Sequence, residues 1–233
     1  MANVYKITQG QESVKLLNYY DNTEVEIPLD KSLTPAKNAE RYYKKYNKQK
    51  RAKVVLDEQL KSAQDEENYL NGVLEQTELA KEVFDYDLII DELIELEYIK
   101  TNKPKNLKEK QKPYRNYSVF GFNVRVGRNN IENDKLVGSA KNCDVWLHAK
   151  DYHSSHVIIE TLGKEVPKNV IEISAQICGY YSKQRNGGKA EIVYTEKKNL
   201  KKPKGAKPGF WTYEGYKSTV VSPNCNTEFI KLT

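Results

Sequence analysis

A segment of 46 residues, from Ala36 to Lys81, contains no proline and a single glycine, Gly72. Thr34 and Pro35 precede it, and threonine at the N-cap with proline at the first helical position is a typical helix start. Because no helix breaker follows, the sequence predicts one uninterrupted helix, roughly 70 Å long at ~1.5 Å per residue. Such a length predicts an extended element beside a smaller compact domain.

The apolar positions of this helix follow a coiled-coil spacing. If Tyr42 is placed at position a, the seam consists of Tyr42, Tyr46, Gln49, Lys53, Leu56, Leu60, Ala63, Glu67, Leu70 and Leu74. A narrow stripe of this kind needs a second helix to bury it, and the sequence contains no matching one. The expected partner is an antiparallel helix from a preceding part of a longer protein, or a second copy. The helix is then either a spacer arm or an oligomerisation element.

Residues 4–9, 13–19 and 24–29 alternate apolar and polar side chains, with turn residues between them. This pattern predicts a small antiparallel β-meander of three strands. Because the chain enters the first of these strands almost at once, we expect it to be a piece of a longer protein.

A second, shorter helix is predicted from Asp85 or Asp87 to Ile99, with apolar residues around most of its circumference. Such a helix is expected to be sandwiched between the long helix and a following domain. The next residues are rich in lysine and contain prolines, which is typical of a linker. The predicted division is an acidic arm over residues 1–100, a basic linker over residues 101–113 and a domain over residues 114–233.

In that last part, short apolar runs alternate with turn signals. Strands are predicted at residues 118–122, 123–126, 144–149, 156–160, 191–194, 210–213 and 218–221. Helices are predicted at residues 130–139 and from Pro167 to about Tyr181. The predicted fold class is α+β, a long coiled-coil helix with a small β-meander followed by a compact, mostly antiparallel α+β domain.

Charge is divided unequally along the chain. Residues 1–100 hold 14 basic and 20 acidic side chains, whereas residues 101–233 hold 24 basic and 12 acidic ones. This asymmetry predicts a basic domain with an anionic partner. The three cysteines have no metal-ligand spacing and are expected to be reduced thiols of a cytoplasmic protein. Neither a signal peptide nor an apolar run of membrane-spanning length occurs, so no membrane contact is expected.

The densest group of polar side chains lies between Gly127 and Val157, where all three histidines occur. Asp144 and His148 are four residues apart on a predicted strand and share a face, a pair suited to general acid–base catalysis. No nucleophile or phosphate-loop motif accompanies them, and the spacing of zinc ligands is absent. No catalytic residue, metal or cofactor is therefore predicted, because a polar network explains the same residues.

A lysine-rich loop follows this stretch. Residues 197–207 contain six lysines, and the prolines and glycines among and after them lead directly into the strand predicted at residues 210–213. A run of lysines is usually a solvated tail, but a loop that is anchored on both sides presents its charge in one place. The loop is therefore expected to bind the phosphates of a nucleic acid.

The stretch that begins at Gly127 is expected to add further donors. Gly127 would allow close approach of the backbone to a phosphate, and Arg128, oriented by Asp134, would bind that phosphate. Trp146 is expected to lie in the core. The predicted nucleic-acid-binding residues are Arg125, Arg128, Asn129, Asn133, His148, Ser155, His156, Lys183, Arg185, Lys198, Lys201, Lys202, Lys204 and Lys207.

Five ordered motifs resemble one known family. They are Gly127-Arg128-Asn129 with Asn133-Asp134, Asp144-Val145-Trp146-Leu147-His148, Ser155-His156-Val157, Gly179-Tyr180-Tyr181-Ser182-Lys183 and the run from Lys201 to Gly209. Together they resemble NFACT-R, the RNA-binding module at the C-terminal end of NFACT proteins. Residues 29–46 are similar to the second half of that family's middle coiled coil. One departure is His153-Ser154, where the family usually has Pro-Gly.

This resemblance implies a role in ribosome-associated quality control, in which NFACT proteins direct untemplated C-terminal tailing on stalled large ribosomal subunits. The resemblance does not extend to the family's N-terminal domain and helix-hairpin-helix region, which are not expected in this chain. The chain is therefore expected to be a non-catalytic fragment that binds tRNA and the large ribosomal subunit. An older family name implies an alternative, a fibronectin-binding surface adhesin, although no secretion signal occurs. A third hypothesis is a structural dimer built on the long helix.

Overall fold

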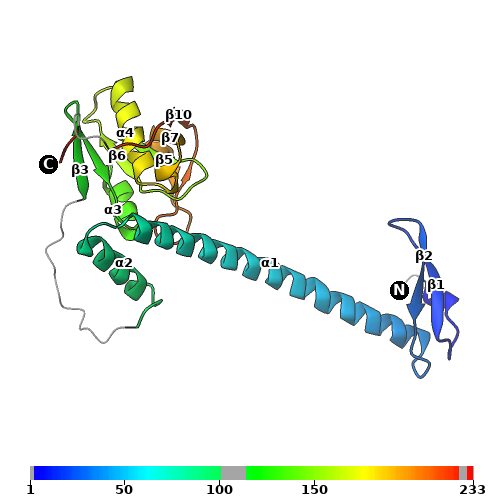
Figure 1. Cartoon of the computed structure of the whole chain (residues 1–233). Coiled ribbons are helices and arrows are strands. Elements are labelled where there is room, and N and C mark those ends of the chain that lie inside the picture. Colours follow the sequence, from blue (N-terminus) through cyan, green and yellow to red (C-terminus); the bar gives the residue numbers. More distant parts are fainter. Residues whose placement is uncertain (1–2, 101–113, 226–229, 233) are drawn as a thin grey trace. The chain divides into compact units, whose positions relative to one another are not determined.

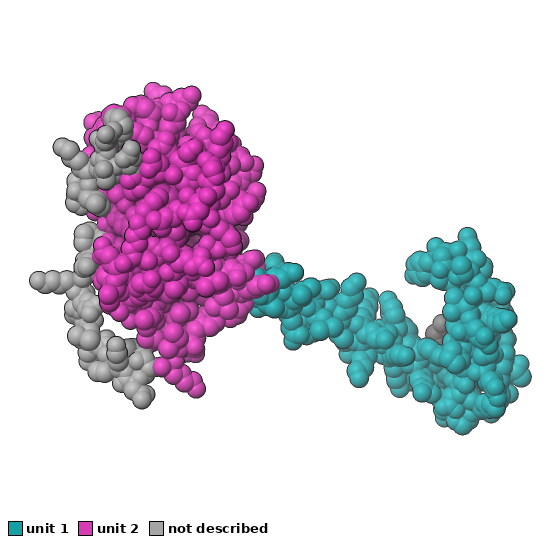
Figure 2. Space-filling view, in the orientation of Figure 1, with its two compact units in different colours: residues 1–64 teal, residues 65–233 magenta. Residues whose placement is uncertain are grey.

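A computed structural model of the chain describes residues 3–100, 114–225 and 230–232. The chain forms two compact units, Met1–Gln64 and Asp65–Thr233 (Figure 2). The linker predicted at residues 101–113 lies outside the described residues, and the predicted division into arm, linker and domain stays a prediction. No helix within the described ranges is long and apolar enough to cross a membrane. The predicted α+β fold class is confirmed.

The first unit begins with a short 3-10 helix, η1 (Val4–Lys6), and a β-hairpin of β1 (Ser13–Asn18) and β2 (Thr23–Pro28) (Figure 1). The predicted three-stranded meander was therefore wrong in its first strand. A period-two pattern becomes a strand only when a neighbouring strand takes up its hydrogen bonds. Here the N–H groups of Lys6 and Ile7 donate instead to carbonyls three residues earlier.

The long helix, α1 (Pro35–Leu79), starts where its sequence predicts. The side chain of Thr34 accepts a hydrogen bond from the N–H of Lys37 at 3.3 Å, as an N-cap does. The buried Asn38 exchanges hydrogen bonds with the backbone of Asp30, whose N–H donates to its Oδ1 at 2.8 Å and whose carbonyl accepts from its Nδ2 at 2.9 Å. These bonds fasten the start of α1 to the chain that follows the hairpin.

Within the first unit the apolar positions of α1 remain open. Tyr46, Leu56 and Leu60 of the predicted seam are 57%, 61% and 59% exposed. In a coiled coil a second helix covers such side chains, so this long helix is consistent with one strand of a coiled coil. Its partner, in cis or from a second copy, stays a prediction.

The second unit opens with the last turns of α1, which pack on α2 (Val83–Glu95) through Tyr69, Val73 and Ile89. This helix ends before the predicted Ile99. Glu97 adopts a positive φ of 64°, and the N–H groups of Tyr98 and Ile99 both donate to the carbonyl of Leu93. Such a closure is a C-terminal cap of the Schellman type.

A seven-stranded sheet, antiparallel between all neighbours, forms the centre of the second unit, in the order β10-β7-β5-β6-β4-β3-β11. Its strands are β3 (Arg115–Val119), β4 (Phe122–Val126), β5 (Val145–Ala149), β6 (Val157–Glu160), β7 (Ala190–Glu196), β10 (Lys217–Val221) and β11 (Ile230–Leu232). The β3–β4 hairpin turns at Phe120 and Gly121, both at positive φ, two residues earlier than predicted. Those angles suit a tight hairpin turn.

The sheet has helices on both faces (Figure 1). One face, with Val124, Leu147 and Ile159, packs on α4 (Lys168–Tyr180). The opposite face carries Trp146 and Ile158 and packs on α3. The remaining elements are α3 (Asn130–Ser139), η2 (Lys183–Asn186), η3 (Lys197–Asn199) and a two-stranded ribbon of β8 (Leu200–Lys201) and β9 (Thr212–Tyr213). The lysine-rich loop, residues 197–207, runs through η3 and β8 into the connection to β9. The strand predicted at residues 210–213 is shorter than expected, because β9 begins at Thr212.

Candidate nucleic-acid interface

The polar stretch that starts at Gly127 faces the interior of the second unit. A Cβ at Gly127 would lie 2.1 Å from Oδ1 of Asn133, which accepts a hydrogen bond from the N–H of His156 at 3.1 Å. The glycine therefore allows close approach of Asn133, and approach of its backbone to a phosphate stays a prediction. Asn133, Ser155 and His156 are all buried. Their part in RNA binding, still a prediction, would be to hold the surface in shape.

The N-terminus of α3 is held by side chains of α2 and of α3 itself. Asn129 is its N-cap and accepts from the N–H of Glu132 at 2.7 Å, while its Nδ2 donates to the carbonyl of Leu88 at 2.9 Å. Asn129 is 3% exposed and bonded to both helices, so its direct contact with a phosphate stays a prediction.

Glu92 of α2, 1% exposed, joins three helices. Its Oε1 accepts from the hydroxyl of Tyr69 on α1 at 2.7 Å and from Nδ2 of Asn130 on α3 at 2.9 Å. Its Oε2 accepts from the N–H groups of Asn130 and Ile131 at 2.9 Å and 3.4 Å. A carboxylate at a helix N-terminus also interacts favourably with the helix dipole. The sequence analysis missed Glu92. The feature that could have revealed it is a charged residue three positions after Ile89, on the apolar face of α2.

The guanidinium of Arg128 is 11% exposed and pairs with α2. Its Nε lies 3.5 Å from Oδ1 of Asp85, whose Oδ2 is bound by Nη2 of Arg115 at 2.7 Å, and the guanidinium covers the ring of Phe84. The partner expected for Arg128, Asp134, was therefore wrong. Nη1 of Arg128 also lies 3.8 Å from Oε1 of Glu132, whereas Asp134 is bound by the lysine-rich loop and Trp211.

Arg125 on β4 is engaged as well. Its Nη2 lies 2.8 Å from Oε1 of Glu160 on β6, and its guanidinium lies over the ring of Tyr114. Its side chain is only 16% exposed. Direct phosphate contact by Arg125 or Arg128 stays a prediction and would require these ion pairs to open.

The three histidines gather around a cavity of about 60 Å³, which the last turns of α1 cover. His148 stacks on Trp146, which lies in the core as predicted, and meets His156 edge to face with ring centroids 5.2 Å apart. Burial lowers the pKa of His148 to about 4, and burial together with the neighbouring His148 lowers that of His156. Both are therefore neutral at physiological pH.

The catalytic pair considered for Asp144 and His148 does not form. The carboxylate of Asp144 accepts from the N–H groups of Lys141 at 2.8 Å and Thr161 at 3.0 Å, so it closes a turn and connects to β6. Among residues 3–100, 114–225 and 230–232, no group of three acidic, cysteine or histidine side chains could hold a metal ion. A second cavity, of about 460 Å³, lies where β5, β6 and β7 meet the start of α4, and none of the predicted site residues lines it.

Gly72, the single glycine of α1, lies directly over this polar stretch. A Cβ at Gly72 would lie 3.2 Å from Nδ1 of His153, and one turn later Nε2 of Gln76 donates to Oδ1 of Asn130 at 2.8 Å. The polar stretch is therefore a seat for the end of α1. Sequence reasoning did not connect the lone glycine of the helix with the histidines.

The lysine-rich loop is fastened at both ends by Asp134 of α3. Its Oδ1 accepts from the N–H of Gly209 at 3.0 Å and from Nε1 of Trp211 at 2.8 Å, and its Oδ2 pairs with Lys202. Gly209 has a φ of 79°, and a Cβ there would lie 2.6 Å from Oδ1 of Asn130. The loop is thus an anchored element rather than a free tail.

The lysines of this loop differ in exposure. Lys198 and Lys201 have side chains that are 57% and 71% exposed, with exposed acidic neighbours, and Lys204 is exposed beside Gly205 at the tip. Lys207 turns inward, donates to the hydroxyl of Tyr98 at 3.0 Å and lies over its ring. Exposed ion pairs contribute little, so the outward lysines remain available to an anion.

Lys183 and Arg185 lie on η2, after the end of α4. Nζ of Lys183 is 2.7 Å from Oε1 of Glu75, and Nη2 of Arg185 donates to the hydroxyl of Tyr180 at 2.6 Å. The predicted residues therefore form two groups. The inner group packs against α1 and α2, and the second group consists of the outward lysines together with Arg185 on η2. This second group is the candidate interface.

Comparison with known proteins agrees with this architecture. Residues 1–112 match the family described as NFACT N-terminal and middle domains, and residues 112–214 match the NFACT protein RNA binding domain. The chain belongs to the NFACT family. The resemblance found in the sequence motifs is thus confirmed, and the second NFACT match covers most of the sheet with both faces and the lysine-rich loop.

Its relatives include bacterial proteins named Rqc2 homolog RqcH. That of Bacillus subtilis is 36% identical over 97% of this chain, and that of Streptococcus suis 39% identical over 94%. The chain spans about 40% of the length of these relatives. The solved structure of the C-terminal part of a fibronectin/fibrinogen-binding protein from Streptococcus suis has 36% identity and a TM-score of 0.76, covering 82% of this chain and 77% of that one.

Proposed function

We propose that this NFACT chain is a non-catalytic RNA-binding part of a ribosome quality-control factor, which grips tRNA and the large ribosomal subunit during C-terminal tailing. The observation that carries the proposal is the lysine-rich loop, which α3 fastens at both ends while Lys198, Lys201 and Lys204 face outward. The match to the family's RNA binding domain and the names of the RqcH relatives support it.

The mechanism is phosphate neutralisation on a preformed surface. Lysine contacts to phosphate release counterions, so the affinity depends strongly on salt and weakly on base sequence. Because the loop is already ordered by Asp134, little conformational entropy is lost when RNA binds. The buried polar stretch then holds the lysine-rich loop and the end of α1 in fixed positions relative to each other.

Replacing Lys198, Lys201 and Lys204 together with glutamine is expected to weaken tRNA binding about tenfold at moderate salt, because three phosphate-facing charges are lost. The slope of log affinity against log salt should fall by about 2. Filter binding or fluorescence anisotropy over a salt series measures both quantities.

The matched control replaces three other exposed lysines of the second unit, Lys141, Lys164 and Lys168, and changes net charge equally. Equal weakening by the two triple variants would contradict a loop-specific site. Crosslinking in cells, followed by identification of the bound RNA, tests the finer proposal. Recovery of messenger RNA in place of tRNA and large-subunit RNA would sink it.

The second candidate is fibronectin binding, which the name of the solved Streptococcus suis relative favours. If RNA binding is the function, protease added to intact cells should leave the protein untouched until lysis. Degradation on intact cells, together with retention on immobilised fibronectin at physiological salt, would favour an adhesin. The triple lysine variant distinguishes the two functions. If the loop is specific for RNA, this variant should be retained on fibronectin as well as the parent protein is.

A further inference from the structure

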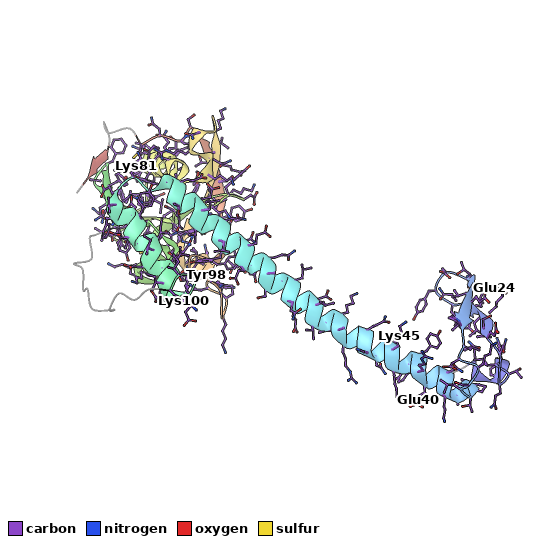
Figure 3. All side chains as sticks on the ribbon, turned by 60° about the horizontal axis from the view of Figure 1, so that its bottom comes forward. Glu24, Glu40, Lys45, Lys81, Tyr98 and Lys100 are labelled. Atoms are coloured by element: carbon purple, nitrogen blue, oxygen red, sulfur yellow. The ribbon has the colours of Figure 1, made fainter. Side chains whose placement is uncertain are left out.

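Two positively charged side chains meet at one tyrosine hydroxyl. Nζ of Lys81, in the turn between α1 and α2, donates to Oη of Tyr180 at 2.5 Å, and Nη2 of Arg185 donates to the same oxygen at 2.6 Å. Both cations also lie over the Tyr180 ring, at 5.1 Å and 4.1 Å from its centroid. Figure 3 labels Lys81 at this turn, beside the sheet domain. The three groups therefore belong to three elements, the α1–α2 turn, α4 and η2.

Two acids of the neighbouring turns pair with other cations. Glu75 of α1 pairs with Lys183 at 2.7 Å, and Asp85 of α2 pairs with Arg115 at 2.7 Å. Within residues 3–100, 114–225 and 230–232, no carboxylate lies within 4.0 Å of the charged nitrogens of Lys81 or Arg185. The pair thus carries two positive charges with only a neutral hydroxyl between them.

This arrangement is electrostatically incomplete. Two unit charges about 5 Å apart repel by roughly 1 kcal/mol in water and by several times more in a low-dielectric setting. A hydroxyl accepts both hydrogen bonds without cancelling either charge, and its own proton remains to be donated. An anion beside Tyr180 would remove the repulsion and accept from all three groups.

Phosphate has the matching chemistry. Its oxygens accept several charge-assisted hydrogen bonds at once, and an arginine with a lysine and a hydroxyl is a typical donor set for one phosphate. The cluster belongs to the same unit as the lysine-rich loop, and Tyr180 and Arg185 fall within residues 112–214, the match to the RNA binding domain. Lys81 falls outside that match, so the end of the long helix would contribute to the same site.

We infer that Lys81, Tyr180 and Arg185 form a composite site for one backbone phosphate of RNA, built jointly by the α1–α2 turn and the RNA-binding domain. The inference rests on the proposed function and extends it. The site adds a phosphate contact on different elements from the lysine-rich loop. Two separate contacts fix the direction of an RNA strand, which one lysine-rich loop cannot do.

The test uses tRNA as the probe and the double variant Lys81→Gln with Arg185→Gln. Both cations serve one phosphate, so the double variant should bind about tenfold more weakly while the salt slope falls by only about 0.7. Each single variant should already give most of that loss. The control Lys168→Gln removes one charge, as each single variant does, at the other end of α4 and should match the parent protein.

A direct readout is the Nε–H signal of Arg185 in nuclear magnetic resonance spectra, assigned by its loss in Arg185→Lys. It should shift on titration with tRNA. A shift with inorganic phosphate alone and none with tRNA would reassign the site to a free anion and overturn the inference. So would a double variant that binds tRNA as Lys168→Gln does.

The outcomes separate this site from the lysine-rich loop. Loss of binding in the Lys198, Lys201 and Lys204 triple variant, with full binding in the Lys81 and Arg185 double variant, refutes only the composite site. The reverse result refutes the loop as the carrier of the proposed function and supports the composite site. A parent protein whose tRNA binding ignores salt refutes both.

Discussion

Replacing Glu92 with glutamine is expected to lower the free energy of unfolding of the second unit by about 3 kcal/mol. Every group that touches the carboxylate is a donor: the Tyr69 hydroxyl, the Asn130 amide and the N–H groups of Asn130 and Ile131. Glutamine would turn an NH2 group toward one of these donors and leave it buried without a partner. The favourable interaction of the charge with the N-terminus of α3 would also be lost.

Denaturant unfolding of the full chain, followed by the signals of its tryptophans, measures this loss, since Trp146 and Trp211 both lie in the second unit. Glu95→Gln, on the exposed side of the same helix, is the control and should stay within about 0.5 kcal/mol of the parent. Tyr69→Phe removes one of the four hydrogen bonds and should cost about 1 kcal/mol. A Glu92→Gln midpoint equal to that of Glu95→Gln would contradict the assigned role of the carboxylate.

Local sequence patterns were enough to predict most helices and strands of the chain. Thr34 and Pro35 locate the start of α1, and the sequence patterns locate six of the seven strands of the large sheet to within a few residues, whereas β11 was not predicted. The helix over Asn130–Ser139 has the predicted bounds, because its N-cap is the adjacent Asn129. For the two helices the deciding interaction, the N-cap, lies within a few residues along the chain.

The orientation of the polar stretch could not be predicted in this way. Its side chains suit either a phosphate or another polar element, and composition does not distinguish the two. The decision is made by Asp85 and Glu92, which are remote in sequence and lie buried in α2. Two sequence signals pointed there, namely carboxylates among the apolar positions of a short helix and the single glycine of a long one, Gly72.

The candidate interface was predicted more completely where its residues lie on loops. Lys198, Lys201 and Lys204 face solvent as a phosphate-binding role requires, and they lie on η3, on β8 and on the connection from β8 to β9. The contribution of Lys81 could not be foreseen, since it depends on the packing of the α1–α2 turn beside Tyr180.

Acidification from pH 7 to pH 5 is expected to lower the free energy of unfolding by about 2 kcal/mol through His148 alone. Burial between Trp146 and the end of α1 lowers the pKa of this imidazole to about 4, against an ordinary value near 6.5. Between these two pH values the unfolded chain binds a proton that the folded chain does not, so stability falls as the pH falls. The loss should begin just below pH 7 and level off near pH 4. The lowered pKa of His156 adds to the loss in the same direction.

His148→Gln removes the titrating group and should take away about 2 kcal/mol of the decrease between pH 7 and pH 5. The control is His153→Gln, since His153 is only half-buried. Burial lowers its pKa, and the nearby carboxylate of Glu75 partly opposes that effect. That variant should keep most of the decrease. Equal pH profiles for His148→Gln and the parent would show that folding does not lower the pKa of His148, so that the folded chain would hold its proton at pH 5. Stacking on Trp146 would then occur with a cation, and the polar seat of α1 would not require a neutral imidazole.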